Sequence, residues 1–204
     1  MIRHPARLWK VSGEKISCGV CARRCMIAKG GRGFCGVREN TDGVLYANSY
    51  GRLTAANLDP IEKKPLYHFL PGTTTFSVSG FGCNFTCKHC QNYTLSQTTS
   101  IPAEYVPPEA VVQDAVLLGA KSISFTYNEP TISFEYVYDT AKLAKEQGLT
   151  SAFITNGYLS KEALLELAPF LGAIRIDLKA FTDAFYKEVC GARLKPVLDT
   201  ILLS

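Results

Sequence analysis

Three cysteines lie close together in the stretch GFGCNFTCKHCQN, at Cys83, Cys87 and Cys90. Thiolates bind soft metals, and four of them ordinarily close a structural zinc site or an iron–sulfur cluster. Three thiolates can hold three corners of a four-iron, four-sulfur cluster and leave the fourth iron open to a substrate or cofactor. No further cysteine close in the sequence completes the set, so the spacing predicts a metal centre with an open coordination position.

The alternative for this loop is structural zinc with His89 as the fourth ligand. His89 lies between Cys87 and Cys90, which is an unfavourable position for closing the same tetrahedron. Gly80 and Gly82, ahead of the cysteines, would let the backbone fold tightly around a bulky cofactor. The open cluster is therefore the favoured interpretation.

A second group of cysteines lies nearer the N-terminus, at Cys18, Cys21, Cys25 and Cys35. These four thiols form a complete ligand set, and both structural zinc and an auxiliary iron–sulfur cluster accept four thiolates. The sequence leaves the two metals open, with zinc slightly favoured. The eighth cysteine, Cys190, stands alone, and we predict that it is a small buried hydrophobe.

The composition is that of a folded protein with a sizeable core. The chain has 204 residues, of which 47% are hydrophobic and 20% charged, and its net charge of +4 is spread along the sequence. This charge is only weak support for nucleic-acid binding. No apolar run resembles a signal peptide or a membrane span, so we expect a cytoplasmic protein. In that reducing compartment, cysteines favour metal binding or catalysis over disulfides.

From residue 76 onward, strand patterns alternate with helix patterns, which predicts right-handed crossovers and a parallel sheet. Reactive groups in such sheets gather in the loops beyond the carboxyl ends of the strands. The three-cysteine loop and the motifs NEP, TNG and DLK all fall in those loops. The expected strands are 76–81, 122–127, 151–155 and 173–178, and the expected helices are 107–119, 132–147, one capped by Ser160, one capped by Thr182 and one with Pro196 in its first turn.

Residues 1–70, rich in Gly, Arg and Cys, are predicted to form a metal-binding annex, and residues 71–204 the main domain. The stretch 59–72 is interpreted as the connection between them, with Lys63 and Lys64 as a solvated face or, alternatively, a substrate or partner contact. The last element, KPVLDTILLS, resembles an unfinished helix. We therefore expect a fragment, or one half of a split protein.

The residues of the cysteine loop resemble a known signature. CNFTCKHC is similar to the motif of radical S-adenosylmethionine (radical SAM) enzymes, and CQN, NEP, TNG and DLK resemble pyruvate formate-lyase activating enzymes. The N-terminal C-x2-C-x3-C-x9-C, with GVREN, DPIEKKPLYHFLPG and FTYNEPT, resembles radical SAM proteins of the AmmeMemoRadiSam group. The resemblance covers nearly the whole chain. It implies a partial (β/α) barrel, C-terminally incomplete because four of its usual six strands are readable.

The resemblance also implies an activity. Cys83, Cys87 and Cys90 would ligate a four-iron, four-sulfur cluster, whose open iron takes S-adenosylmethionine. Reductive cleavage gives a 5′-deoxyadenosyl radical, which abstracts hydrogen from a substrate that the sequence does not name. A glycine on a glycyl-radical-type partner protein is one candidate, as in activating enzymes, which are oxidoreductases. A low-potential ferredoxin or flavodoxin is the expected electron donor.

Further positions are implied to contact the cofactor, although the resemblance names no catalytic residue. The backbone around His89 would contact adenine, the turn at Tyr127 would receive the amino group, and Thr155 would lie near the ribose. Asn128 replaces a family glycine, and Ile154 stands where activating enzymes can carry a cation-binding aspartate. The full set is His89, Gln91, Asn92, Tyr127, Asn128, Glu129, Thr155, Asn156, Asp177, Leu178 and Lys179.

A non-catalytic metal-binding module is the rival hypothesis, either a zinc-stabilised RNA-binding protein or an iron–sulfur electron carrier. Neither requires polar motifs at successive strand ends, which is the feature that favours an enzyme.

Overall fold

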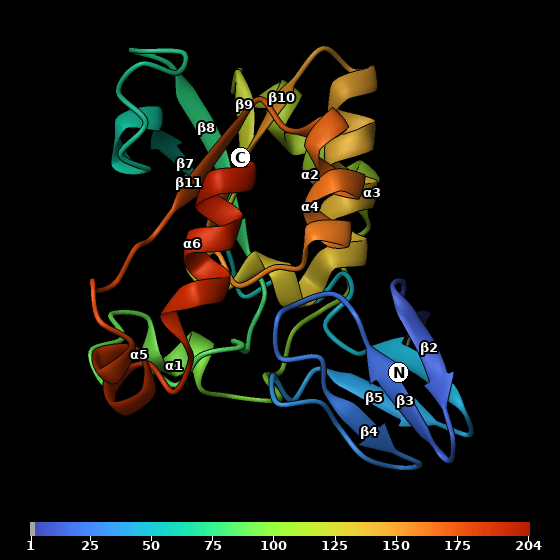
Figure 1. Ribbon diagram of the computed structural model, residues 1–204. Helices are drawn as coiled ribbons and strands as arrows, with labels where there is room; N and C mark the ends of the chain where they lie inside the picture. The colour runs from blue at the N-terminus through green and yellow to red at the C-terminus, as the bar shows by residue number, and fades with distance from the viewer. Residues whose placement is uncertain (1–2) are drawn as a thin grey trace.

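A five-stranded sheet organises the larger part of the chain. In the computed structural model, which describes residues 3–204, its strand order is β11-β10-β9-β8-β7, with β7 and β11 at the two open edges (Figure 1). Strands β8 to β11 are parallel, and β7 pairs antiparallel with β8. Their bounds are β7 Ala55–Pro60, β8 Thr74–Ser79, β9 Ser122–Phe125, β10 Thr150–Thr155 and β11 Ala173–Ile176. The predicted α/β fold with a parallel sheet is confirmed, and the sheet is open.

Helices cover this sheet, and α2, α3 and α4 stand together on one side of it (Figure 1). The two predicted caps are present: Ser160 Oγ accepts a hydrogen bond from Ala163 N at 3.1 Å, and Thr182 Oγ1 accepts one from Phe185 N at 3.3 Å. The helix expected over 132–147 begins as a 3-10 turn, because Pro130 opens it. The helices are η1 Ile61–Lys63, α1 Tyr93–Ser96, α2 Pro108–Leu117, η2 Pro130–Ser133, α3 Phe134–Glu146, α4 Lys161–Leu167, η3 Ala168–Phe170, α5 Asp183–Val189 and α6 Leu194–Leu203.

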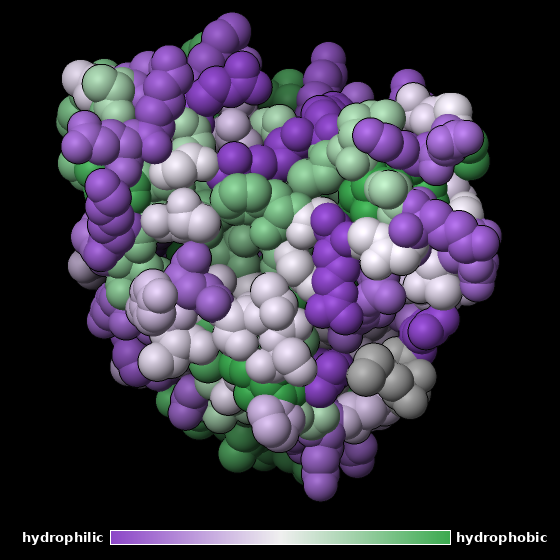
Figure 2. Space-filling view, turned by 90° about the horizontal axis from the view of Figure 1, so that it is seen from below, coloured by the Kyte–Doolittle hydropathy of each residue, from purple (hydrophilic) through white to green (hydrophobic). Residues whose placement is uncertain are grey.

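The N-terminal region folds into two small antiparallel sheets, with strand orders β1-β6-β5 and β2-β3-β4. It lies beside the ends of the main sheet from which the cysteine loop, α1 and α5 project (Figure 1). Seen from below, this end of the molecule has hydrophilic residues around much of its edge and paler or hydrophobic residues nearer its middle (Figure 2). The strands are β1 His4–Pro5, β2 Trp9–Ser12, β3 Lys15–Cys18, β4 Met26–Ala28, β5 Arg38–Thr41 and β6 Val44–Ala47.

Backbone and ionic contacts tie the N-terminal region to the main sheet. Ala22 N donates to Tyr158 O at 2.9 Å, and Ser160 N donates to Val20 O at 3.0 Å, so residues 20–22 run along the loop that follows β10. Arg38 and Glu135, both 1% exposed, form an ion pair with contacts of 2.6 and 2.8 Å. The N-terminal region is therefore packed against the same loops that carry the sequence motifs.

Two features of the connecting stretch differ from expectation. Strand β7, within the range grouped with the N-terminal annex, pairs along its whole length with β8 of the main sheet. Lys64, expected on a solvated face, is 3% exposed, because its ammonium group lies 2.6 Å from the buried carboxylate of Asp59. Among residues 3–204, no helix has the length and apolar character needed to cross a bilayer.

Candidate metal and cofactor site

A cavity of about 660 Å³ opens where the parallel strands end. Its walls come from the cysteine loop after β8 and from the loops after β9, β10 and β11, together with the stretch after β7. Every position implied to contact the cofactor lines it except Leu178, which packs against the hydrophobic cluster around Phe85 and Tyr186. Apart from the three cysteines, the remaining lining residues are Lys63, Lys64, Pro65, Phe85, Ser96, Thr126, Ile154 and Arg175.

Cys83, Cys87 and Cys90 all line this cavity, as their motif predicts. Burial raises the pKa of Cys83, and burial with the neighbouring Cys190 thiol raises that of Cys87 to about 12. The Lys179 ammonium opposes the rise at Cys87. Cys83 Sγ also accepts hydrogen bonds from Phe85 N at 3.3 Å and from the Asn156 amide at 3.9 Å. Hydrogen-bond donors therefore face the sulfur of Cys83, and the Lys179 cation favours the thiolate form of Cys87.

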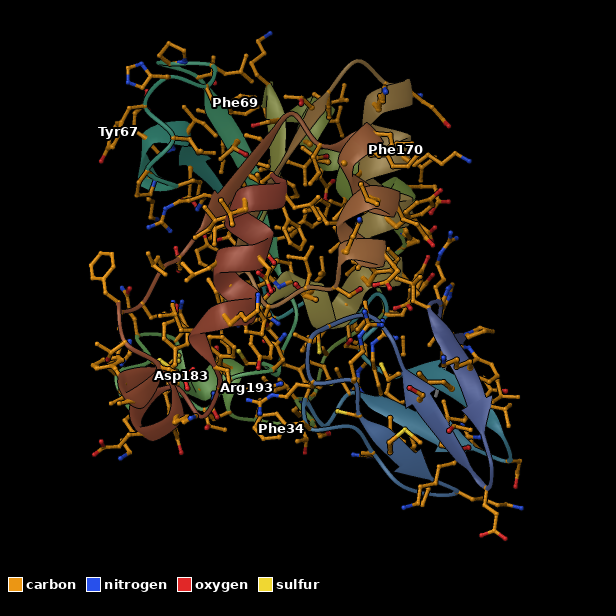
Figure 3. All side chains as sticks on the ribbon, viewed as in Figure 1. Phe34, Tyr67, Phe69, Phe170, Asp183 and Arg193 are labelled. Carbon is orange, nitrogen blue, oxygen red and sulfur yellow. The ribbon has the colours of Figure 1, made fainter. Side chains whose placement is uncertain are left out.

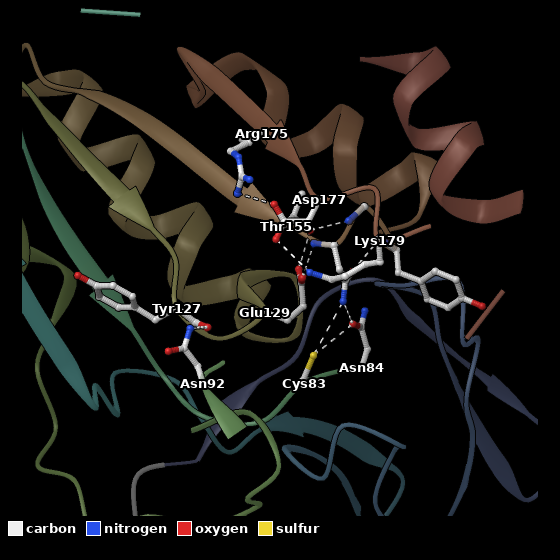
Figure 4. Close-up of polar contacts among 12 residues, drawn as sticks. Cys83, Asn84, Asn92, Tyr127, Glu129, Thr155, Arg175, Asp177 and Lys179 are labelled. Carbon is white, nitrogen blue, oxygen red and sulfur yellow. Dashed lines mark hydrogen bonds and ion pairs between the residues drawn. The ribbon is translucent and has the colours of Figure 1, made fainter. Parts of the chain in front are cut away.

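Glu129 is the centre of a buried hydrogen-bond network (Figure 4). Its Oε1 accepts from Thr155 Oγ1 at 2.7 Å and from Thr131 N at 3.0 Å, while its Oε2 accepts from Asn156 N at 2.8 Å. Burial raises the pKa of Glu129, and these donated bonds oppose the rise. Asn156 in turn donates to Asn84 Oδ1 at 2.7 Å. One carboxylate thus fixes the end of β10, which is itself bonded to the cysteine loop.

The turn after β9 is held to the cysteine loop from the other side. The Asn92 amide donates to Tyr127 O at 2.8 Å, and the Asn128 amide donates to Gly82 O at 3.2 Å. Tyr127 has a φ of +66°, a left-handed conformation that is uncommon for a residue with a Cβ atom. Such strain often accompanies a functional turn. The side chain of Asn128 thus serves as a donor to the loop backbone.

Opposite this turn, Asp177 pairs with two cations at the end of β11 (Figure 4). Its carboxylate lies 2.5 Å from Arg175 Nη1 and 3.1 Å from Lys179 Nζ. Burial alone would lower the pKa of Lys179, but Asp177 and the nearby Cys87 hold it above its ordinary value. The sequence marked Asp177 and Lys179 through the DLK motif but gave no signal for Arg175.

The stretch after β7 adds a cluster that the sequence analysis did not foresee. The buried Asp59 carboxylate accepts from Lys63 at 2.7 Å, from Lys64 at 2.6 Å and from the Tyr127 hydroxyl at 2.5 Å. Burial alone would raise the pKa of Asp59, but these hydrogen bonds hold it well below its usual range. The cluster positions Tyr127 and places two ammonium groups on one carboxylate, which leaves excess positive charge in the cavity wall.

Asp59 gives a testable pH dependence. Because its folded-state pKa is depressed, its stabilising contribution is present above the unfolded value of about 3.9 and is lost as pH falls through the folded value. We expect Asp59→Asn to lower the free energy of unfolding at pH 7, with a gap from the wild type that narrows below pH about 4. Urea titrations of both proteins at pH 7, 5 and 3 measure this difference in the free energy of unfolding. A gap that is constant across this range would show that the ionised carboxylate contributes nothing.

The four N-terminal cysteines lie in one region, close enough for three of them to influence the pKa of the fourth, Cys21. Within residues 3–204, however, no three of their sulfur atoms lie within 4.8 Å of one another. One tetrahedral zinc would need sulfurs roughly 3.8 Å apart. This arrangement does not display a preformed site for a single ion.

Comparison with known families assigns the chain to a superfamily. The sequence model of the radical SAM superfamily matches residues 77–203, more than half of the chain. The chain belongs to the radical SAM superfamily. Membership in this superfamily implies a four-iron, four-sulfur cluster, S-adenosylmethionine and cleavage of the latter to a radical. The predicted membership in the radical SAM superfamily is thereby confirmed.

Relatives in Methanocaldococcus jannaschii extend the comparison. An uncharacterised protein is 47% identical over 96% of this chain and 58% of its own length. A protein provisionally named a glycyl-radical enzyme activating enzyme is 31% identical over 59% of this chain and 46% of its own. This radical SAM chain thus spans about half the length of these curated relatives. A solved structure of TYW1 with a lysine–pyruvate adduct bound has 16% identity and a TM-score of 0.39, over 62% of this chain and 49% of its own.

The residues present fit the cluster that a radical SAM protein holds. Cys83, Cys87 and Cys90 do not all lie within 4.8 Å of one another, which is wider than a single tetrahedral ion requires. Thiolates that bind different corners of a cluster need not approach so closely. The cavity they line also leaves space for a ligand much larger than an ion.

Proposed function

We propose that this radical SAM protein belongs to the AmmeMemoRadiSam group and cleaves S-adenosylmethionine reductively to start hydrogen abstraction from a substrate. The observation that carries the proposal is that Cys83, Cys87 and Cys90 open into one cavity with polar residues from three further strand ends. When bound, the cluster supplies the electron that splits the sulfonium into methionine and a 5′-deoxyadenosyl radical.

The residues of the chain have separate tasks in this proposal. Cys83, Cys87 and Cys90 hold the cluster, and Lys179 favours the thiolate form of Cys87. Glu129 fixes Thr155 and Asn156, so that the nucleoside meets a preorganised wall and no reorganisation is needed on binding. The residues proposed to contact S-adenosylmethionine are His89, Gln91, Asn92, Tyr127, Asn128, Glu129, Thr155, Asn156, Asp177 and Lys179.

The substrate is proposed to contact the part of the cavity wall formed by Lys63, Lys64 and Pro65, which are not in the cofactor set. A glycine of a partner protein is the candidate supported by the names of two relatives provisionally described as glycyl-radical activating enzymes. A low-potential ferredoxin or flavodoxin is the proposed electron donor.

The N-terminal thiols are proposed to bind zinc or an auxiliary iron–sulfur cluster. The buried guanidinium of Arg38 supports an anionic centre there, because its Nε and Nη1 have no hydrogen-bond partner. Burial alone would lower the pKa of Arg38, but Glu135, Cys18 and Cys35 hold it above its ordinary value. Four thiolates around a divalent ion would carry the negative charge that this cation faces.

The test is anaerobic reconstitution with iron and sulfide, followed by reduction in the presence of S-adenosylmethionine. Formation of 5′-deoxyadenosine and methionine is the expected result, measured by chromatography. A protein that takes up zinc alone and leaves S-adenosylmethionine intact would support the non-catalytic module instead.

A further inference from the structure

Cys190 lies beside the cysteine loop, although about a hundred residues separate it from Cys87 in the sequence. The ligand atoms of Cys87, His89 and Cys190 all lie within 4.8 Å of one another, the only such metal-ligating group within residues 3–204. Cys190 is fully buried, and its sulfur lies within 4.8 Å of that of Cys87, whose pKa it helps to raise. The expectation of a buried cysteine is met, but its contacts are not those of a simple hydrophobe.

The backbone holds Cys190 in this position. Thr86 N donates to Cys190 O at 3.0 Å and Lys88 N donates to Val189 O at 2.9 Å, so the turn after α5 is paired with the cysteine loop. Gly191 has a φ of +61°, and a Cβ atom there would lie 2.2 Å from Thr86 Oγ1. Only glycine allows this close approach.

Two further contacts close the same turn. Asp183, near Arg193 in Figure 3, accepts a hydrogen bond from Leu194 N at 3.0 Å through Oδ1. The Arg23 guanidinium donates to Gly191 O and, at 2.9 Å, to Asn84 O, which joins the N-terminal region to both segments. The approach of Cys190 to Cys87 is therefore fixed by two backbone hydrogen bonds and by the side chains of Asp183 and Arg23.

Two thiols and one imidazole are a ligand set suited to Zn²⁺ and other soft divalent ions. Thiolate and imidazole ligands of one tetrahedral ion lie within about 4 Å of each other, and the three ligand atoms here lie no more than 4.8 Å apart. His89 is exposed, so solvent can reach the ion and complete its coordination. Two thiolates would neutralise the charge of the ion.

We propose that Cys87, His89 and Cys190 form a binding site for a single soft divalent cation, distinct from the cluster site of Cys83, Cys87 and Cys90. Because Cys87 belongs to both sets, the ion and the cluster exclude each other; this exclusion rests on the proposed function. The site holds the loop in place in cluster-free protein and makes cluster assembly sensitive to zinc.

The test of the site uses the full chain, reduced and metal-free, titrated anaerobically with Co²⁺, whose thiolate charge-transfer absorption reports ligation. Because the N-terminal thiols can also bind Co²⁺, each variant is compared with the wild type by the number of Co²⁺ equivalents that it binds. We expect the Cys190→Ala and His89→Ala proteins each to bind one equivalent of Co²⁺ less than the wild type. Cys83→Ala, a matched cysteine of the same loop outside the trio, is expected to retain it. Cys190→Ser, which keeps the side-chain size, should behave like Cys190→Ala.

Two results would overturn the site: a Cys190→Ala protein that binds as many equivalents as the wild type, or a Cys83→Ala protein that loses the same equivalent. Exclusion is tested separately by adding two equivalents of Zn²⁺ before iron and sulfide, one for the N-terminal thiols and one for Cys87, His89 and Cys190. We expect this to reduce iron uptake in the wild type and not in Cys190→Ala, and equal uptake would refute exclusion. Failure to form 5′-deoxyadenosine would count against the proposed function and leave the Co²⁺ result unaffected.

Discussion

A Cys83→Ala protein, reconstituted anaerobically, is expected to lose the absorption of the cluster held by this loop and to form 5′-deoxyadenosine more than about 100-fold more slowly than the wild type. Replacing residues that merely support metal ligands already costs 10- to 100-fold, and Cys83 is proposed as a ligand itself. Cys87→Ala and Cys90→Ala should show the same loss. Iron content and product formation are measured on the same sample.

The matched control is Lys88→Ala, in the same loop but with an exposed side chain. It should retain iron and activity, because its backbone N–H, which bonds Val189 O, is unchanged. Retention of the full iron content in all three alanine variants would mean that these thiols do not hold the cluster.

An Arg38→Met protein is expected to be less stable by about 3–5 kcal/mol, because the change leaves a buried carboxylate without its cation. Glu135 accepts hydrogen bonds from two groups that lie far from it in the sequence. They are the Arg38 guanidinium, at 2.6 and 2.8 Å, and the Arg7 backbone N–H, at 2.6 Å. Both members of the ion pair are 1% exposed, so water cannot replace the lost partner. The midpoint of urea unfolding, followed by circular dichroism, measures the effect.

Two further variants make this result interpretable. Lys195→Ala removes an exposed ion pair with Asp199, which ordinarily contributes at most about 1 kcal/mol. The double variant Arg38→Met, Glu135→Leu removes both charges, and we expect it to recover much of the lost stability, as replaced buried pairs commonly do. If the double variant is as unstable as Arg38→Met, packing and not charge explains the loss.

Local signals in the sequence were sufficient to predict the parallel strands of the main sheet and the caps of two of its helices. Ser160 and Thr182 act within three residues of their own positions, so their caps depend on short-range hydrogen bonds that any helix start offers. Strand β7 was missed because AANLDP contains residues depleted in strands. It forms at an edge, where pairing with β8 outweighs its weak intrinsic preference.

The candidate site likewise contains residues that local sequence motifs predicted and residues that only the folded chain brings into place. The motif residues at the carboxyl ends of the strands reach one cavity because parallel topology brings successive strand ends together, which the sequence pattern alone predicts. Arg175 was not marked because nothing local distinguishes it from a solvated arginine. The burial of Lys64 depends on its ion pair with Asp59, whose carboxylate also accepts a hydrogen bond from the Tyr127 hydroxyl.

The sequence by itself thus determined the radical SAM family, the parallel α/β architecture and most of the residues around the cavity, since these depend on spacing within short segments and on the order of elements. Only the tertiary structure decided that Cys190 meets Cys87 and His89, that Lys64 is buried, and that Arg38 ties the N-terminal region to α3. Each of these contacts joins residues that are separated along the chain or oriented by a particular backbone turn. Their distances result from packing of the whole chain, and no local pattern encodes them.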